Sequence, residues 1–586
     1  MSAVDVREPA TLARTTSGAP LPSALERARL RWDALHRGRE RLWAWLGALA
    51  VTALAFAMRI DDLGSPRRFA FDETYYAKDA WALLTQGYVR DYLDTVGGQD
   101  VNDAILDGRT SGIWAEGPSM EVHPEVGKWL IALGEKAFGM DPFGWRISAV
   151  VAGSLMVLVI CRLGRRLTGS TVLGLVAGLL LTFDGLQFVL SRLALLDIYL
   201  ALFLLCAVAC VVNDRDWFRR RLADRWDGAH EASGAPAALG PVAAVLVRPW
   251  LLAGGVCFGL ALGTKWTAAY PLAAFGVLVW LWSAGARRAH GVRWARLRTA
   301  FVDGAAAFVQ LVGVAALVYV ASWTGWLIHA SEYEQHLSST QYTGFIAENG
   351  CTGEGEDRTA DNSFDDDARW PTATEPDATG PGELVQSLRS LWYYHRDVYT
   401  FHTHYLNCAD HTYRSDPLGW PLIGRTVGVA TDLDVQPGED GCTAEAGSVC
   451  YRQVLLIGTP VLWWSGAVAL LAAAALWIGR RDWRFGVPVV GMLASWLPWT
   501  LYDSRPIFYF YAVAFLPFTV LALTMVCGAI IGPDRTPSRR RTAGVVVTGT
   551  LLVLVVANFA YLHPLLTYEV IPREAWLDRM WLQRWI

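Results

Sequence analysis

The sequence predicts an all-α protein that crosses a membrane many times, and three observations lead to this fold class. Of the 586 residues, 53% are hydrophobic and only 18% are charged, whereas soluble domains carry about 25% charged residues. The apolar residues are concentrated in runs of about 20 residues, the length of a membrane-spanning helix. The chain also contains 28 tryptophans, which collect at the two faces of a bilayer.

The hydrophobic runs give about eleven candidate spans. They cover residues 42–58, 147–163, 171–190, 194–212, 249–266, 268–284, 303–325, 454–478, 485–501, 506–531 and 543–562. The first 30 residues are polar and lack the apolar core of a signal peptide, so we expect the first run to be retained as a span.

Clusters of arginine orient these spans, because short cytoplasmic loops carry an excess of basic residues. With the N-terminus inside and eleven crossings, all six clusters fall on the cytoplasmic side. The clusters are the stretch up to Arg41 and residues 162–166, 215–225, 287–298, 480–484 and 535–541. The predicted organisation is a cytoplasmic arm 1–41, a transmembrane module 42–325 with an outer loop 59–146, a large outer loop 326–453, a second module 454–563, and an outer tail 564–586.

The cysteines agree with this orientation. Cys351, Cys408, Cys442 and Cys450 all fall in the large outer loop, where one or two disulfides can form outside the reducing cytoplasm. The outer tail carries three tryptophans near its end, which suggest a helix in the membrane interface.

Charged residues beside the spans gather at the outer ends. Each one alone is more often a snorkelling side chain or a structural ion pair. Seven on one side favour a polar cavity that holds an anion such as a lipid phosphate. They are Arg59, Arg146, Asp184, Arg192, Asp197, Lys265 and Arg505.

The first outer loop contains the adjacent acids Asp72 and Glu73, followed by an amphipathic pattern that predicts a helix on the membrane surface. Further on, His123, Pro124 and Lys128 open another helix. An acidic pair alone is more often a helix N-terminal charge. Beside a cationic pocket it suits group transfer, in which one carboxylate takes the acceptor proton while cations stabilise a departing phosphate.

A metal site is not expected. His395, His402, His404 and His411 lie close together, but their spacing matches no common zinc pattern. The acidic pair could bind a divalent ion, yet no full ligand set is visible. We therefore predict no cofactor and no nucleic-acid partner.

These blocks, in order along about 59–563, resemble the protein O-mannosyltransferase family of the actinobacterial type. Each block alone is weak, and together they are specific. The blocks are Phe71-Asp72-Glu73 with Tyr75; His123-Pro124 with Gly127-Lys128; Leu195-Leu196-Asp197; Gly263-Thr264-Lys265-Trp266; Leu391-Trp392-Tyr393-Tyr394-His395; Phe401-His402; His411 to Pro417; Trp420-Pro421; and Arg505-Pro506 with the aromatic run to Tyr511. The sequence departs from the family pattern at Glu125, in the acidic insertion around Asp366, at the cysteines and at Phe510.

The resemblance implies the GT-C architecture, with an extracytoplasmic site under the first loop. It implies transfer of one mannose from polyprenyl-phosphate-mannose to Ser or Thr hydroxyls of exported proteins, with inversion at the anomeric carbon. Asp72 would be the general base, and Glu73 would orient the acceptor or maintain the local field. The residues expected to bind the donor phosphate or substrate are Arg59, Arg146, Lys128, His123, His395, Asp197, Lys265 and Arg505. The expected partners are the lipid donor, secreted or membrane acceptor proteins and the export machinery.

Two alternatives remain open. The first is another GT-C transferase, which would move arabinose or mannose onto a glycolipid or a cell-wall glycan; the His123-Pro124 block and the aromatic-histidine block of the large loop favour a protein acceptor instead. A transporter or lipid flippase would show polar residues near the midplane and paired internal repeats; the sequence shows neither.

Overall fold

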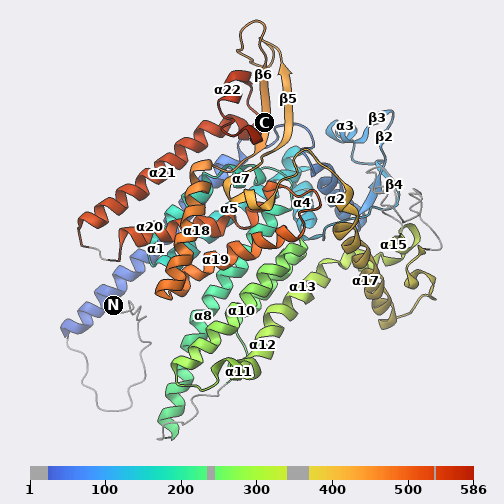
Figure 1. Ribbon diagram of the computed structural model, residues 1–586. Helices are drawn as coiled ribbons and strands as arrows, with labels where there is room; N and C mark the ends of the chain where they lie inside the picture. Colours follow the sequence, from blue (N-terminus) through green and yellow to red (C-terminus); the bar gives the residue numbers. More distant parts are fainter. Residues whose placement is uncertain (1–23, 234–243, 340–367, 534–535) are drawn as a thin grey trace.

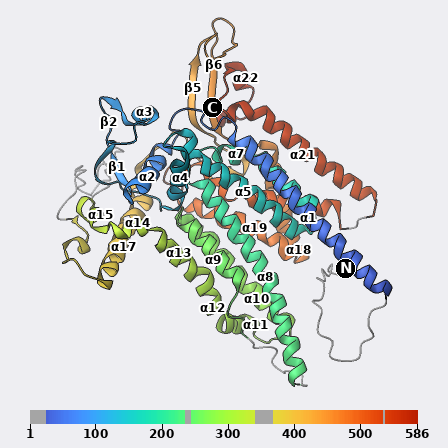
Figure 2. The same cartoon turned by 180° about the vertical axis from the view of Figure 1, so that it is seen from behind.

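The computed structural model describes residues 24–233, 244–339, 368–533 and 536–586 (Figure 1). A bundle of long helices makes up most of the molecule. Figures 1 and 2 show the strands β1 to β6, together with α3 and α17, toward one end of this bundle, while the far ends of α8 and α11 lie at the other.

The bundle helices overlap the eleven predicted spans, with several differences in their bounds. Within the described residues, seven helices are long and apolar enough to cross a membrane, and three more apolar helices are shorter. The bundle consists of α1 (Ala24–Ile60), α5 (Pro142–Thr168), α6 (Thr171–Thr182), α8 (Asp197–Ser233), α9 (Pro249–Leu262), α10 (Ala269–Ala289), α11 (Ala295–Thr299), α12 (Ala305–Phe308), α13 (Val314–Ser322), α18 (Pro460–Arg480), α19 (Trp483–Trp496), α20 (Leu516–Ile531) and α21 (Arg539–Leu566).

Several of the predicted spans are not single continuous α-helices, and two of them have a clear local reason. The third ends as a helix at Thr182, because the Asp184 carboxylate accepts the Gln187 N–H and starts the separate helix α7 (Gly185–Leu190). The eighth was predicted to begin at 454. Instead, residues up to Leu456 form strand β6 (Cys450–Leu456), and the helix begins at Pro460.

Close packing between α9 and α13 positions the segment that follows α9. Gly255 and Gly259 stand four residues apart, so small residues line one face of α9. A Cβ atom on Gly259 would lie 2.6 Å from the Val318 Cβ and 2.8 Å from the Ala315 carbonyl oxygen, both in α13. The carbonyl of Gly263, four residues further on, accepts the Val126 N–H at 2.8 Å, which ties the end of α9 to the start of α4.

The first loop is a small folded unit, not a strip on the membrane surface. Its helix α2 (Glu73–Gln86) packs against α4 (Val126–Phe138), and most of α2 is buried, including Lys78 and Asp79. The prediction of a surface-lying amphipathic helix is therefore wrong for α2. The other elements of the loop are β1 (Arg90–Tyr92), β2 (Thr95–Val96), β3 (Gln99–Asp100), α3 (Val101–Leu106) and β4 (Trp114–Pro118).

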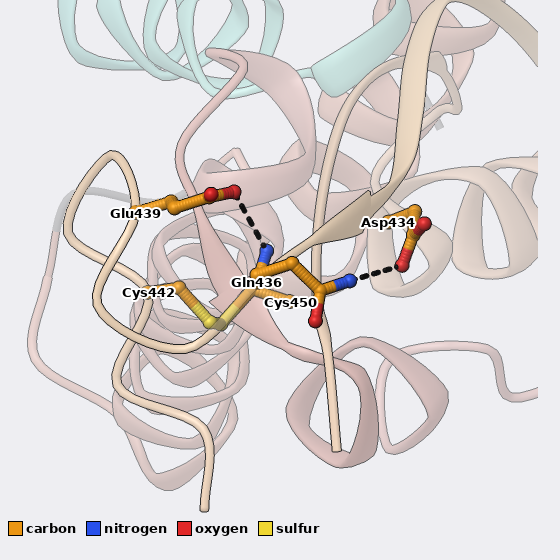
Figure 3. The surroundings of a disulfide bond; sticks show 5 residues. All are labelled: Asp434, Gln436, Glu439, Cys442 and Cys450. Carbon is orange, nitrogen blue, oxygen red and sulfur yellow. Dashed lines mark hydrogen bonds between the residues drawn. A yellow bond between two sulfur atoms is a disulfide. The ribbon is translucent and has the colours of Figure 1, made fainter. Parts of the chain in front are cut away.

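The large loop carries the helices α14 (Thr324–Ile328), α15 (Ala330–His336) and α17 (Pro381–Thr403), and the strand β5 (Val427–Val435). Strands β5 and β6 pair antiparallel in a projecting hairpin (Figure 1). The Cys442–Cys450 disulfide closes the hairpin loop beside Gln436 and Glu439 (Figure 3), which confirms that a disulfide forms in this loop and supplies a pairing that the sequence left open. Cys351 and the side chain of Cys408 lie outside the described residues.

The C-terminal tail joins this hairpin. Its strand β7 (Ile571–Pro572) pairs with β6, and α22 (Arg573–Leu577) follows. The indole N–H groups of Trp576 and Trp585 are buried and donate to Gln453 and to the Ile423 carbonyl, respectively. An interfacial helix was therefore the wrong prediction for the tail; of its three tryptophans, only Trp581 is exposed.

Candidate functional site

Asp72 stands at the N-terminus of α2, directly after a strained residue. Phe71 has a φ of +54°, a conformation that is an outlier for a bulky side chain and is typical of functional sites. The rings of Phe508, Phe510 and His411 meet Phe71 edge-on, with centroids 5.6, 5.7 and 6.0 Å away. This aromatic contact holds the turn, and the turn presents the partly exposed Asp72 carboxylate.

The neighbouring Glu73 is fully buried and forms a two-pronged ion pair with Arg146. The Arg146 Nε and Nη2 donate to the two Glu73 oxygens at 2.8 and 2.7 Å. The same carboxylate accepts the backbone N–H groups of Ala70 and Ala194. Glu73 therefore joins the residues before Asp72 to the bundle, and it positions Asp72 rather than the acceptor.

Arg146 has no N–H left for a phosphate. An arginine offers five N–H donors. Besides the two that bind Glu73, the others bind the carbonyls of Leu63, Pro66 and Arg68 at 2.9–3.2 Å. This geometry does not support the prediction that Arg146 binds the donor, because every donor atom is already committed to the fold of the first loop.

Lys265 and Asp197 form a second buried pair beside Asp72. The Lys265 Nζ lies 2.8 Å from the Asp197 Oδ2 and 4.7 Å from the centre of the Tyr511 ring. Lys265 follows the end of α9, and Asp197 is the first residue of α8. Helix and loop ends from distant parts of the sequence thus meet at Asp72.

The surroundings of Asp72 suit a proton acceptor at near-neutral pH. Burial raises the pKa of this carboxyl from 3.8 to about 6, although the nearby Lys265 cation lowers the pKa. The Asp197 charge adds to the rise, and the Tyr76 hydroxyl, which donates to Asp72 Oδ2 at 3.4 Å, opposes it. A general base works best when its pKa lies near the working pH.

Arg505 is a cation without a counter-ion. No carboxylate within the described residues forms an ion pair with it, and its buried Nε has no hydrogen-bond partner there. Its Nη1 donates to the His402 Nδ1 at 2.9 Å and to the His402 backbone carbonyl at 3.3 Å. A partly buried, unpaired guanidinium favours an anionic ligand.

His123 lies among these cations. Burial lowers the pKa of His123 well below its usual value, and the charges of Lys265, Lys128 and Arg505 lower it further. Its ring stacks on that of His402, with centroids 5.6 Å apart, and faces the Tyr76 ring at 6.3 Å. His123 is therefore neutral and lies in a region of positive potential.

The contacts of the other predicted site residues are with partners other than Asp72. Lys128 is buried against Glu121 and Asp79, at 2.6 and 2.9 Å. The His395 Nδ1 bonds the Leu391 carbonyl, and its ring stacks on Trp266.

Arg59 also lies away from Asp72. It is fully buried within the bundle, where it donates to the carbonyls of Ala55 and Thr182 and to the Gln187 side chain. Its Nε has no partner among the described residues, but none of these contacts joins it to Asp72. The contacts of Lys128, His395 and Arg59 are thus with other parts of the fold, and their roles in donor binding stay predictions.

Sequence reasoning missed three residues of the site, namely Tyr76, His402 and Tyr511. His402 and Tyr511 lie in the Phe401-His402 block and in the aromatic run, which both carry the family resemblance. The sequence therefore pointed to these residues but did not assign them a role. Tyr76 follows Asp72 by one helical turn, a spacing that places two side chains on one face.

Among the described residues, no group of three or more His, Cys, Asp or Glu side chains could hold a metal ion. The site can nonetheless do two things at once. A carboxylate can accept a proton while nearby cations stabilise an anion that leaves, which is the requirement for transfer from a phosphate-linked donor.

Comparison with known proteins adds to this description. The family model described as dolichyl-phosphate-mannose-protein mannosyltransferase matches residues 49–226. The model for the C-terminal four-transmembrane region of protein O-mannosyltransferase matches residues 387–585.

Two curated relatives cover nearly the whole chain. A protein of Mycolicibacterium smegmatis named polyprenol-phosphate-mannose–protein mannosyltransferase is 34% identical, over 93% of this chain and 94% of its own length. A protein of Mycobacterium tuberculosis with the same name is 32% identical, over 93% and 92%.

Among solved structures, the Saccharomyces cerevisiae protein O-mannosyltransferase Pmt1-Pmt2 complex bound to the sugar donor has a similar fold. The TM-score is 0.62, and the match covers 93% of this chain and 92% of that chain. At 13% identity, this similarity concerns the fold.

Proposed function

The chain belongs to the protein O-mannosyltransferase family and is a multi-pass membrane glycosyltransferase; from this premise we propose how its site works. The donor is polyprenol-phosphate-mannose, as named for the mycobacterial relatives. The acceptors are Ser and Thr hydroxyls of exported or membrane proteins. Association with the export machinery stays a prediction from the family resemblance.

Asp72 acts as the general base in this proposal. The acceptor oxygen attacks the anomeric carbon of mannose, the bond from that carbon to the phosphate oxygen breaks, and polyprenyl phosphate leaves. The hydroxyl proton moves to the Asp72 carboxylate. One displacement inverts the anomeric configuration, so no covalent enzyme intermediate forms. The observation that carries this assignment is the partly exposed Asp72 carboxylate, with its raised pKa, beside the Lys265–Asp197 pair.

Arg505 and Lys265 stabilise the phosphate as negative charge grows on it. Arg505 is the stronger candidate, because within the described residues it has no carboxylate partner, whereas Lys265 is paired with Asp197. His123, which is neutral and flanked by the same cations, can donate a hydrogen bond to the donor.

The site belongs on the extracytoplasmic side. The site is built from the first residue of α8 and from the segment after α9. The basic residues of α5, α10 and α18 lie in the last turns of these helices, at the ends opposite to the site. Because basic residues mark the cytoplasmic face, Asp72 faces outward. A cysteine placed at exposed Tyr75, beside Asp72, should react with a membrane-impermeant maleimide in intact cells.

The alternative acceptor is a glycolipid or a cell-wall glycan. Membranes from a strain that lacks its own enzyme and expresses this chain would receive radiolabelled polyprenol-phosphate-mannose and a Thr/Pro-rich peptide. We expect label on the peptide. Label found only in lipid or glycan would show that the alternative acceptor is the correct one.

The proposed phosphate contact predicts the effect of removing Arg505. Arg505→Gln should reduce kcat/KM for the donor by about 100-fold, because a charge-assisted contact to the leaving phosphate is lost. Arg389→Gln is the matched control, since Arg389 is exposed and pairs only at the surface with Glu375. Equal activity of the two variants would remove Arg505 from the donor site.

The raised pKa of Asp72 predicts the pH dependence of transfer. The base must be ionised, and its carboxylate fraction falls as the pH drops through about 6. We expect kcat/KM to decline tenfold per pH unit below about pH 6 and to be constant above pH 7. A profile that stays flat down to pH 4.5 would instead indicate a base with an ordinary carboxyl pKa.

The cations Lys265 and Arg505 also predict that no metal ion is needed, because they supply the charge that a divalent ion would bring to a phosphate. Transfer by the purified protein should be unchanged by EDTA. A loss of activity that Mg²⁺ or Mn²⁺ restores would contradict this prediction.

A further inference from the structure

His402 uses both of its ring nitrogens to connect two parts of the site. It lies in the last turn of α17, in the large outer loop. Its Nδ1 lies 2.9 Å from the Arg505 Nη1, and its Nε2 lies 3.0 Å from the Val122 carbonyl oxygen. The ring therefore bridges the segment after α19 and the segment that carries His123.

These partners determine where the His402 proton resides. An arginine only donates hydrogen bonds and a carbonyl only accepts them. The Nδ1 must therefore accept from Arg505, and the Nε2–H must donate to Val122. Burial lowers the pKa of His402 to about 3, and the Arg505 cation contributes to the shift. The ring is neutral, in a single tautomer.

Two further contacts orient the same ring. His402 stacks on His123, with an angle of 18° between the ring planes, and meets the Trp266 ring at 6.2 Å. Its backbone carbonyl accepts a second bond from the Arg505 Nη1, at 3.3 Å. Arg505 thus depends on His402 for two of its contacts, and within the described residues no carboxylate replaces them.

We propose that His402 is a positioning residue for the donor: it directs Arg505 toward the phosphate and ties this arginine to the His123 segment. The inference rests on the proposed function. The docking of α17 then completes the donor site, so that the large outer loop sets the affinity for polyprenyl phosphate without touching the reacting atoms.

Two nearly isosteric variants of His402 separate its hydrogen bond with Arg505 from its hydrogen bond with the Val122 carbonyl. In His402→Asn, the side-chain oxygen can replace Nδ1 as the acceptor for Arg505. In His402→Gln, the terminal amide can replace the Nε2–H toward Val122, but the acceptor for Arg505 is lost. His404 lies two residues after His402, is exposed, and forms a hydrogen bond with the Thr403 hydroxyl. The variant His404→Gln therefore serves as the control.

The readout is the Kd of the purified, detergent-solubilised protein for polyprenyl phosphate without the sugar. We expect His402→Gln to raise this Kd about tenfold, the size of one hydrogen bond to a charged group. His402→Asn should stay within about threefold of the parent protein, and His404→Gln should leave the Kd unchanged. In an Arg505→Gln background, His402→Gln should add less than about twofold.

Equal weakening by the Asn and Gln variants, or full additivity with Arg505→Gln, would overturn the proposal and leave His402 a packing residue. Thermal unfolding of each variant identifies a loss of affinity that is due to misfolding. If the parent protein binds polyprenyl phosphate but transfers no mannose, the proposed function fails, while the Kd comparison still decides the role of His402.

Discussion

Asp72→Asn is expected to lower kcat about 10²- to 10⁴-fold, the usual contribution of a general base. Asparagine has nearly the same shape, and the Asp72 side chain makes no capping hydrogen bond, so α2 should still begin at the same residue. What is lost is the ability to accept the hydroxyl proton. The Kd for polyprenyl phosphate should change little, because in the proposed site Asp72 acts on the acceptor, and Arg505 and Lys265 hold the phosphate.

Asp100→Asn is a matched control for this variant. Asp100 is the N-cap of α3 in the same loop, where its carboxylate accepts the Asn102 N–H, and it has no contact with Asp72. Both variants replace an acid at a helix start with its amide, and only one is expected to stop transfer. If Asp72→Asn keeps kcat within threefold at equal expression, Asp72 is not the base.

Arg146→Met should destabilise the folded protein by about 3–5 kcal/mol, the cost of leaving one member of a buried ion pair alone. Glu73 would keep its buried charge and lose its two strongest donors, and three backbone carbonyls would lose theirs. We expect a lower Tm in detergent and a lower yield in membranes, and the remaining folded fraction should bind polyprenyl phosphate with unchanged Kd.

The double variant Glu73→Gln with Arg146→Met tests the reason for this loss. Without the buried carboxylate charge, part of the stability should return, because the cost comes from an unpaired charge more than from missing contacts. An Arg146→Met protein with an unchanged Tm but a weakened Kd would instead return Arg146 to the donor site, as the sequence had suggested.

The spans could be predicted because the bilayer imposes a single strong rule on length and hydrophobicity. The errors arose where an apolar run serves another purpose. The apolar run from Val454 to Ile457 resembles the start of a membrane span, yet it contributes to strand β6 of the hairpin. The helix begins only at Pro460. The tail tryptophans read as interfacial anchors, yet Trp576 and Trp585 fill the space beside that hairpin.

The sequence predicted which types of residue form the site, but it predicted only some of the contacts between them. Charge near the spans indicated Arg146, Lys265 and Arg505 equally, since an unpaired and a paired arginine look the same in a sequence. Only the tertiary contacts distinguish them, by committing all five N–H groups of Arg146 to the fold and leaving Arg505 without a carboxylate. His402 was missed for the same reason, because its role depends on partners from two distant segments.

The most direct test of the central claim is the anomeric configuration of the mannose that the purified chain places on a Thr-containing peptide. We expect the label on the threonine hydroxyl, with a configuration opposite to that of the polyprenol-phosphate-mannose donor, because Asp72 assists a single displacement. Mannose that reaches the peptide with the donor's configuration would require a covalent intermediate and would contradict the mechanism. Label that never reaches the peptide would contradict the function itself.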